Sequence, residues 1–483
     1  AAHQVDLVYC VPGESFLPIT DAMRDRSDME LIVCRHEGGA ALMAVAHARS
    51  RGEPGVCMVS RGPGAMNAAI GFHVAYHDAE PVVFLIGQAE RHRLGRMALQ
   101  EMNYAKTFSD TTKLVIEVYE PSQVSESIAR AFHVAQSGTP GPVAVILPED
   151  VLYSDEEVPM AGQRPLPTAG VTPDNLSTAL EMIRHAQRPV IIAGGRVHGE
   201  KCLGDLTRFA EQFSIPVLAA HRRLHTFDSN HPLAAGRLTN RAPAPLMEQL
   251  HQADLVIVLG ERLGPSVSQG FTFPRAPKPD QPVIHVWPDA SELGRVWETA
   301  LPLPCDPQAF LTALLDSEPG EIPPTRQAWI TTLNAIHRDL MTWQEASAND
   351  GVVFGRVTRA IDRNLAPDAA VTYDAGNFTS WVNRFVGQTQ RNMFIGATVG
   401  AMGAGVPSGV AAGLAKRGRQ VVVFVGDGGV MMTGNELATA IQYGVPIKIF
   451  VANNSQFGTI RMHQAKSFPG RSTPSTNLTN PDF

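Results

Sequence analysis

The sequence predicts an α/β protein with three doubly wound parallel-sheet domains. The chain has 483 residues, enough for roughly two to four domains. It is 44% hydrophobic and 18% charged, so it can bury several cores and is not typical of a disordered chain. Apolar runs of strand length alternate with helical patterns in three blocks, as in layered α/β folds. We expect domains at residues 1–155, 170–317 and 345–483.

The first block contains a series of short apolar runs, with helical patterns between several of them. Strands are expected at Leu7–Cys10, Leu31–Cys34, Val56–Ser60, Val82–Ile86, Leu114–Val118 and Val143–Leu147. Several prolines between positions 148 and 173 then mark a linker, because proline interrupts both helices and sheets.

The second and third blocks show the same alternation. In the second block, strands are expected at Val190–Ala193, Val217–Ala220, Leu255–Leu259 and Val283–Val286. In the third block they are expected at Ala370–Tyr373, Val421–Val425 and Ile447–Ala452. No G-x-G-x-x-G pattern opens a helix in the second block, so a Rossmann dinucleotide site has little support there.

Charge and cysteine usage exclude several classes of function. The net charge is −7 with acids and bases interspersed, which gives no basic block for nucleic acid or an anionic membrane. The apolar runs are too short to span a bilayer. None of the five cysteines forms a C-x-x-C pair, which favours reduced core residues and a cytoplasmic protein. The sequence opens without Met and stops within a predicted domain, so we expect trimmed ends and leave a targeting segment open.

Residues 421–454 carry the most informative pattern in the chain. Two predicted strands flank a helical segment that Thr433 and Glu436 should open as a T-x-x-E capping box, and that Gly444 should end. A unit of this kind gives parallel strands with a right-handed crossover. The carboxyl ends of both strands therefore lie at one edge of the sheet, where open parallel sheets bind ligands.

Asp427 and Asn454 follow these two strands, so their side chains should converge at that edge. The chemistry suits Mg²⁺ carrying a diphosphate, because Mg²⁺ prefers oxygen ligands and leaves room for phosphate oxygens. Gly428 and Gly429 lack side chains, so their N–H groups can approach phosphate closely. An ordinary glycine-rich turn would explain Gly-Asp-Gly alone, but the strand contexts and the asparagine pair together favour a site.

The stretch resembles the thiamine diphosphate (ThDP) motif, which opens with Gly-Asp-Gly and closes with Asn-Asn. The resemblance implies that Asp427, Asn454 and the main-chain oxygen of Gln456 bind Mg²⁺. It also implies that Gly428 and Gly429 are cofactor-binding residues.

Glu37 stands where a predicted strand passes into an alanine-rich helix, within Arg-His-Glu-Gly-Gly. Taken alone, it is an acid favoured by the start of a helix. The next strand, however, ends in Arg-Gly-Pro-Gly-Ala-Met-Asn at residues 61–67. Together the two segments resemble the pyrimidine-binding domain of acetolactate synthases and related ThDP decarboxylases.

That resemblance implies that Glu37 hydrogen-bonds N1′ of the cofactor's aminopyrimidine and drives its imino tautomer, so that the 4′-imine takes the proton from thiazolium C2. It also makes Gly62, Pro63 and Asn67 cofactor-binding residues. A structural and a catalytic role for the neighbouring His36 both stay open.

Two segments of the third block fit the same cofactor. In the first, Gly376 and Asn377 match a diphosphate-contacting loop, although Phe378 replaces a histidine common in the family. In the second, the carbonyl of Gly400 matches the acceptor for the 4′-amino group, and Met402 matches the bulky residue that supports the V-shaped cofactor. A tight packing loop is the alternative reading of the second segment.

The resemblance covers nearly the whole chain and implies decarboxylation of a small 2-oxo acid such as pyruvate, followed by carboligation to a second carbonyl. The product would resemble acetolactate. Gln100 matches a position near the active site, while Leu99 replaces the usual Phe. Thr459 and His463 replace a Met and an aromatic acceptor-pocket residue, so His463 is a candidate for proton transfer or a loop contact.

Several alternatives stay open. The enzyme could be a simple decarboxylase that releases an aldehyde, and the chain could instead be a non-catalytic partner or a flavin or nucleotide module. FAD in the second block is possible but not favoured, since its flavin-contact segments do not match. Because family members join their half-sites across subunits, the resemblance implies a homodimer or homotetramer with the active site at the interface.

Overall fold

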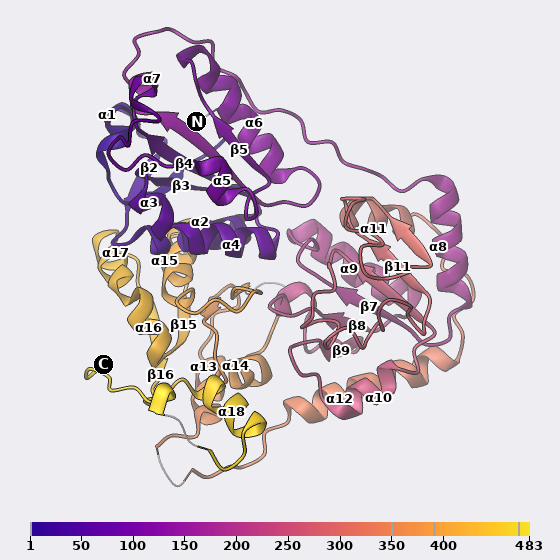
Figure 1. Cartoon of the computed structure of the whole chain (residues 1–483). Helices are drawn as coiled ribbons and strands as arrows, with labels where there is room; N and C mark the ends of the chain where they lie inside the picture. Colours follow the sequence, from indigo (N-terminus) through magenta and orange to yellow (C-terminus); the bar gives the residue numbers. More distant parts are fainter. Residues whose placement is uncertain (1, 349–350, 390–392, 472–473) are drawn as a thin grey trace. The chain divides into compact units, whose positions relative to one another are not determined.

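The computed structural model describes residues 2–348, 351–389, 393–471 and 474–483 (Figure 1). The chain forms two compact units. The first unit contains residues 1–166, 369–379 and 395–483, and the second contains residues 167–368 and 380–394. Each sheet is parallel wherever a strand register is described, which confirms the predicted class of three doubly wound α/β domains.

The N-terminal sheet of the first unit has the strand order β2-β1-β3-β4-β6-β5. Its strands are β1 (Leu7–Cys10), β2 (Glu30–Val33), β3 (Gly55–Val59), β4 (Val82–Gln88), β5 (Leu114–Glu117) and β6 (Pro142–Pro148). The helices are α1 (Leu17–Arg24), α2 (Glu37–Arg51), α3 (Pro63–Asn67), α4 (Ala69–Asp78), α5 (Tyr104–Phe108), α6 (Val124–Gln136) and α7 (Glu149–Leu152). The central strands are apolar along their whole length because helices cover both faces of the sheet.

The C-terminal sheet has the order β14-β13-β15-β16. Its strands are β13 (Ala370–Tyr373), β14 (Met393–Ile395), β15 (Val421–Gly426) and β16 (Ile447–Ala452). They are accompanied by α14 (Thr379–Phe385), α15 (Gly405–Ala415), α16 (Asp427–Thr433), the 3₁₀ turn η5 (Gly434–Glu436), α17 (Leu437–Gln442) and α18 (Gly458–Ser467).

Helices α2 and α15 join the two sheets of the first unit (Figure 1). Both are rich in glycine and alanine, and α2 is buried from Gly38 through Ala48, so their backbones can approach closely. At the end of α2, the buried Arg49 guanidinium pairs with Asp78 and Glu80 and donates to the Gly396 carbonyl. The joint is therefore held by both close packing and a compensated buried charge.

The second unit contains the central sheet, with the order β12-β11-β10-β7-β8-β9. Its strands are β7 (Pro189–Ala193), β8 (Val217–Ala219), β9 (Ala234–Arg237), β10 (Leu255–Leu259), β11 (Val283–Val286) and β12 (Leu301–Leu303). The helices are α8 (Pro173–His185), α9 (Glu200–Phe213), α10 (Ala244–Leu250), α11 (Pro307–Leu315), α12 (Thr325–Met341) and α13 (Phe354–Asp362). Alternate residues of the strands feed two hydrophobic cores, one on each face of the sheet.

Each predicted strand is present, with ends shifted by about two residues at most. The predicted capping box is wrong. A helix already begins at Asp427, and Thr433 ends it with its hydroxyl donating to the Gly403 carbonyl. The Glu436 side chain accepts from main-chain N–H groups of a distant turn, and the reciprocal capping bonds with Thr433 are not formed. Within the described ranges, no helix combines the length and the apolar character needed to cross a bilayer.

Candidate active site

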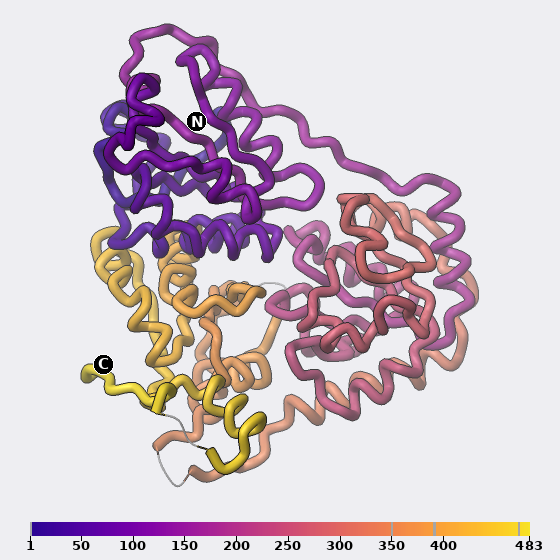
Figure 2. The backbone as a smooth tube through the Cα atoms, viewed as in Figure 1, coloured from indigo at the N-terminus to yellow at the C-terminus, as the bar shows by residue number. Residues whose placement is uncertain are grey.

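The carboxyl edge of the C-terminal sheet brings together the ends of β15 and β16. Asp427 follows β15 directly and is 3% exposed. The Asn480 side-chain amide donates to Asp427 Oδ2 at 2.8 Å and to Asn453 Oδ1 at 3.0 Å. Asn480 belongs to the C-terminal segment, which ends at the label C in Figure 2. In this segment, Leu478 N donates to the Ser455 carbonyl. The segment thus links the two strand ends through an asparagine that the sequence analysis did not single out.

The predicted metal ligands Asn454 and Gln456 lie in the same loop. Asn454 Oδ1 accepts from Gln456 N at 3.2 Å. A Cβ atom added to Gly458 would lie 2.8 Å from Asn454 Nδ2, so this side chain is folded against its own turn. In the described structure, the side chain linked to Asp427 through Asn480 is therefore that of Asn453.

The oxygens at this edge suit a hard cation. Among the described residues, the Asp427 carboxylate accepts from the neutral amide of Asn480, and no three His, Cys, Asp or Glu side chains gather as metal ligands. The partly positive Asn480 amide instead sits between a carboxylate and an amide oxygen. One carboxylate with neighbouring amide and main-chain oxygens is a donor set that suits Mg²⁺ with phosphate and water as further ligands.

At three glycines near this edge, a neighbouring side chain fills the space that a Cβ atom would need. A Cβ atom at Gly428 would lie 2.7 Å from the Phe457 ring, and one at Gly429 would lie 2.3 Å from Asp374 Oδ2. At Gly376 it would lie 2.5 Å from Phe378. Gly428 and Gly429 lie in the first turn of α16, where main-chain N–H groups have no partner within the helix, as a phosphate-binding surface requires.

Asn377 lies beside α18. Its Oδ1 accepts from the Thr459 hydroxyl at 3.0 Å, and its amide lies 3.8 Å from Met462 Sδ. His463 is the next residue on this helix and is exposed. The predicted diphosphate loop and two of the positions that depart from the family pattern therefore lie at the same end of the sheet.

A buried aspartate fixes the loop that contains Gly400 and Met402. Asp374 is 1% exposed and accepts from Gly403 N at 2.8 Å and from Ala375 N at 2.7 Å. Gly400 and Gly403 both have positive φ, at 76° and 81°, which glycine adopts without strain. Met402 is half-buried next to them. Asp374 thus ties this loop to the end of β13.

The N-terminal sheet gathers the predicted pyrimidine-binding residues. Glu37 is the first residue of α2, and its Oε2 accepts from Asn67 Nδ2 at 2.9 Å. Gly62 has a φ of 57° and leads into α3, with Pro63 as the first helical residue. A Cβ atom at Gly62 would lie 2.7 Å from the Gln100 carbonyl. The structure therefore brings these five residues into one group.

Arg61, which the sequence analysis did not single out, holds the Gln100 loop. Its guanidinium is nearly buried, pairs with Glu149 at 2.9 Å and donates to the Leu99 carbonyl at 3.2 Å. Its position within the Arg-Gly-Pro-Gly segment could have marked Arg61 as a candidate site residue. Its pairing with Glu149 could not be predicted from local pattern, because Glu149 lies far along the chain.

Comparisons with known proteins agree with this arrangement. Residues 1–107 match the N-terminal TPP binding domain of thiamine pyrophosphate enzymes, residues 176–314 match the central domain, and residues 374–483 match the C-terminal TPP binding domain. The chain is 30% identical to the acetolactate synthase large subunit of Lactococcus lactis, over 99% of this chain and 83% of the relative. It is also 30% identical to the acetolactate synthase isozyme 2 large subunit of Escherichia coli, over 100% of this chain and 86% of the relative.

The chain belongs to the acetolactate synthase family of ThDP enzymes. In this ThDP-dependent enzyme, the group around Glu37 lies in the segment matched to the N-terminal TPP binding domain. The group around Asp427 lies in the segment matched to the C-terminal one. The two groups of residues therefore correspond to the two TPP binding domains of the family. Enzymes of this family couple decarboxylation to carboligation.

Within one chain, the two groups of this family member lie apart. Asp427 begins α16, which is labelled in Figure 1. The Glu436 side chain, just beyond the other end of this helix, contacts the turn before Glu37. A helix of seven residues rises by about 10 Å. Glu37 and the cluster at Asp427 are therefore at opposite ends of this helix, and we refer to them below as the Glu37 half-site and the Asp427 half-site.

Proposed function

We propose that this enzyme decarboxylates a small 2-oxo acid such as pyruvate and ligates the remaining fragment to a second carbonyl, giving an acetolactate-like product. The observation that carries the proposal is the sheet edge where Asp427 and Asn453 oxygens share the amide of Asn480. Similarity to acetolactate synthases over 99% or more of the chain supports the choice of reaction.

The residues of the Asp427 half-site fit magnesium and the diphosphate of the cofactor. The Asp427 carboxylate, the Asn454 amide oxygen and the Gln456 carbonyl would hold Mg²⁺, and main-chain N–H groups at Gly428 and Gly429 would face phosphate. When bound, ThDP supplies an electron sink for the loss of CO₂. Gly376 and Asn377 would orient the diphosphate at the same edge.

The Glu37 half-site would handle the proton at the aminopyrimidine ring. Glu37 would share a proton with ring atom N1′, while Asn67 holds its other carboxylate oxygen. Gly62 and Pro63 would shape the wall beside the ring, and the Gln100 loop would close it. The Gly400 carbonyl would accept from the 4′-amino group, with Met402 beneath the ring.

We propose that two copies of the chain form the active site. Glu37 and the Asp427 half-site must bind the same cofactor molecule, and within one chain they lie at opposite ends of α16. Apolar side chains on α16 and α17 support this arrangement, since Met431, Met432 and Ile441 are 59%, 52% and 81% exposed. A second copy would cover such a face.

The test is a screen of 2-oxo acids with the full-length protein, Mg²⁺ and ThDP, measuring CO₂ release and products. With pyruvate we expect acetolactate. Glu37→Gln should abolish turnover, because Gln cannot exchange the proton, while Mg²⁺ and ThDP still raise the melting temperature. Absence of CO₂ release with every 2-oxo acid, together with no cofactor-induced rise in melting temperature, would rule the function out.

A simple decarboxylase is the second candidate, and His463 favours it. This side chain lies on α18 next to Met462, which contacts Asn377, so a proton donor stands near the diphosphate loop. Acetaldehyde from pyruvate, in place of acetolactate, would select this candidate. An absorbance spectrum with flavin bands would separately establish that the protein binds a flavin.

A further inference from the structure

Glu436 is a buried carboxylate that the proposed chemistry leaves unused. It follows α16 in the turn η5 and is 0% exposed. Its Oε1 accepts from Arg35 N at 3.1 Å and from His36 N at 3.0 Å, and its Oε2 accepts from the Thr439 hydroxyl at 2.6 Å. Burial raises the pKa of Glu436, against the hydrogen bonds that it accepts. A group this costly to bury needs a structural reason.

The carboxylate oxygens of Glu436 accept hydrogen bonds from the backbone immediately before Glu37. Arg35 and His36 form the turn between β2 and α2. A Cβ atom at Gly39 would lie 2.3 Å from Glu436 Oε1, so the carboxylate rests on the first turn of α2. Cys34, the first residue after β2, still donates to Cys10 of β1, whereas the N–H groups of Arg35 and His36 lie beyond the strand pairing and need other acceptors. Glu436 supplies the missing acceptors from the C-terminal sheet.

We propose that Glu436 is a positioning residue for Glu37. It fixes the two backbone groups that set where the Glu37 side chain starts, and Asn67 holds a carboxylate oxygen at the other end. A catalytic group displaced by about 1 Å can lose roughly 100-fold in rate. Glu436 itself touches no substrate or cofactor. The inference rests on the proposed role of Glu37.

Tyr443 provides a matched control from the same region. Its hydroxyl accepts from Val33 N at 2.7 Å and donates to the Leu31 carbonyl at 2.9 Å. It therefore anchors the same edge strand, β2, but ahead of the turn that leads to Glu37. Tyr443→Phe removes a comparable anchor and leaves the contacts of Arg35 and His36 with Glu436 in place.

The test compares steady-state kinetics of the full-length variants with Mg²⁺, ThDP and the 2-oxo acid that the wild type turns over. Glu436→Ala and Glu436→Asp withdraw the acceptor from Arg35 and His36, so kcat should fall roughly 10- to 100-fold. KM and the cofactor-induced rise in melting temperature should stay near wild type. Glu436→Gln keeps an amide oxygen as acceptor and should recover most of the rate, whereas Tyr443→Phe should keep kcat within about twofold.

The outcomes separate positioning from general stability. If Glu436→Asp lowers the melting temperature as Tyr443→Phe does but leaves kcat unchanged, the inference is overturned. It is also overturned if Glu436→Gln is no better than Glu436→Asp. Should Glu436→Ala fail to fold, the Asp and Gln variants decide. A wild type that neither binds the cofactor nor releases CO₂ would overturn the proposed function, and this inference with it.

Discussion

The Asp427 carboxylate is almost completely buried, and the Asn480 amide donates a hydrogen bond to one of its oxygens. An amide N–H carries only part of a positive charge, so it compensates a buried carboxylate incompletely. A divalent cation on the remaining oxygens would complete the compensation, with Asn480 orienting Asp427 from behind. This makes Asn480 the residue to change if the proposed metal site is to be weakened without touching its ligands.

Replacing Asn480 by Ala should weaken Mg²⁺ binding about tenfold, because outer partners orient metal ligands. Melting temperature measured against Mg²⁺ concentration, at fixed ThDP, gives the apparent affinity. Asn477→Ala is the control, since Asn477 lies in the same segment and bonds Arg461 at 3.3 Å, away from Asp427. An unchanged or higher affinity in Asn480→Ala would show that this amide does not support the metal.

Local pattern identified Glu37 and Asp427 because each directly follows a strand in a short motif. Arg61, Asp374 and Asn480 depend on partners brought close only by folding. Arg61 needs Glu149, and Asn480 reaches Asp427 from far along the chain. Residues that act through such tertiary contacts leave little mark on local sequence, which is why they were not anticipated.

At the scale of elements, buried parallel strands were predicted well because they are continuous apolar runs. The strands that were not predicted include β9 and β12, which contain glycine, arginine or proline and lie at the edges of the central sheet. The capping box failed for another reason. Glu436 has the sequence position of a capping residue, but its carboxylate accepts from the N–H groups of Arg35 and His36 and not from that of Thr433.

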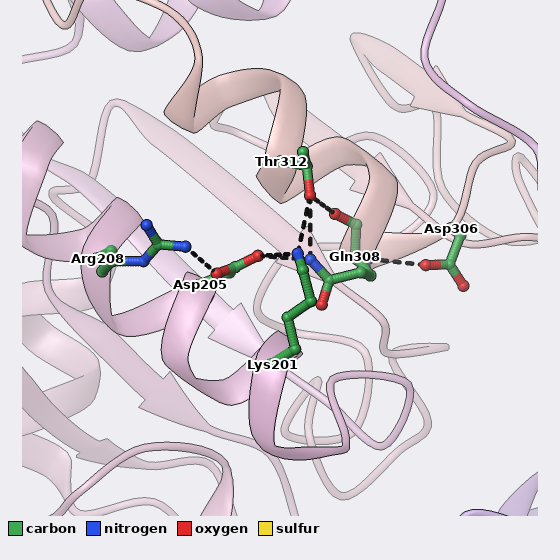
Figure 3. A network of polar contacts seen from close by, with 6 residues as sticks. All are labelled: Lys201, Asp205, Arg208, Asp306, Gln308 and Thr312. Atoms are coloured by element: carbon green, nitrogen blue, oxygen red, sulfur yellow. Dashed lines mark hydrogen bonds and ion pairs between the residues drawn. The ribbon is translucent and has the colours of Figure 1, made fainter.

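Helices α9 and α11 of the central domain are joined by a polar network around Asp205 (Figure 3). Its carboxylate accepts from Lys201 at 2.8 Å, from Gln308 at 2.6 Å and from Arg208. Burial raises the pKa of Asp205, but these hydrogen bonds outweigh it and lower the pKa to about 2. The folded state therefore favours the charged carboxylate.

Asp205→Asn should lower the free energy of unfolding of the central domain by on the order of 1–2 kcal/mol at pH 7. Because the pKa is lower in the folded state, the contribution is complete above about pH 4 and is lost as the pH falls toward about 2. Urea denaturation of both proteins from pH 7 to pH 2 measures this. A stability difference that stays constant with pH would contradict the assignment.

For the whole molecule, the separation of the two half-sites bears on whether one chain or two form an active site. Sequence motifs could place the Glu37 half-site on one sheet and the Asp427 half-site on another, but not say whether one chain unites them. The structure holds them at opposite ends of α16, through the same Glu436 contact that anchors the turn before Glu37. In the proposed dimer, each chain would then offer one half to each of two active sites.

Subunit mixing tests this directly. Glu37→Gln and Asp427→Asn should each abolish turnover alone, since each damages every site of its own homodimer. In a mixed dimer, one site joins an intact Glu37 to an intact Asp427, while the other carries both changes. Random mixing in equal amounts makes half of the dimers mixed, so activity should return to about one quarter of wild type. If unfolding and refolding the two variants together restores no activity, while each regains its own dimer, both half-sites must come from a single chain.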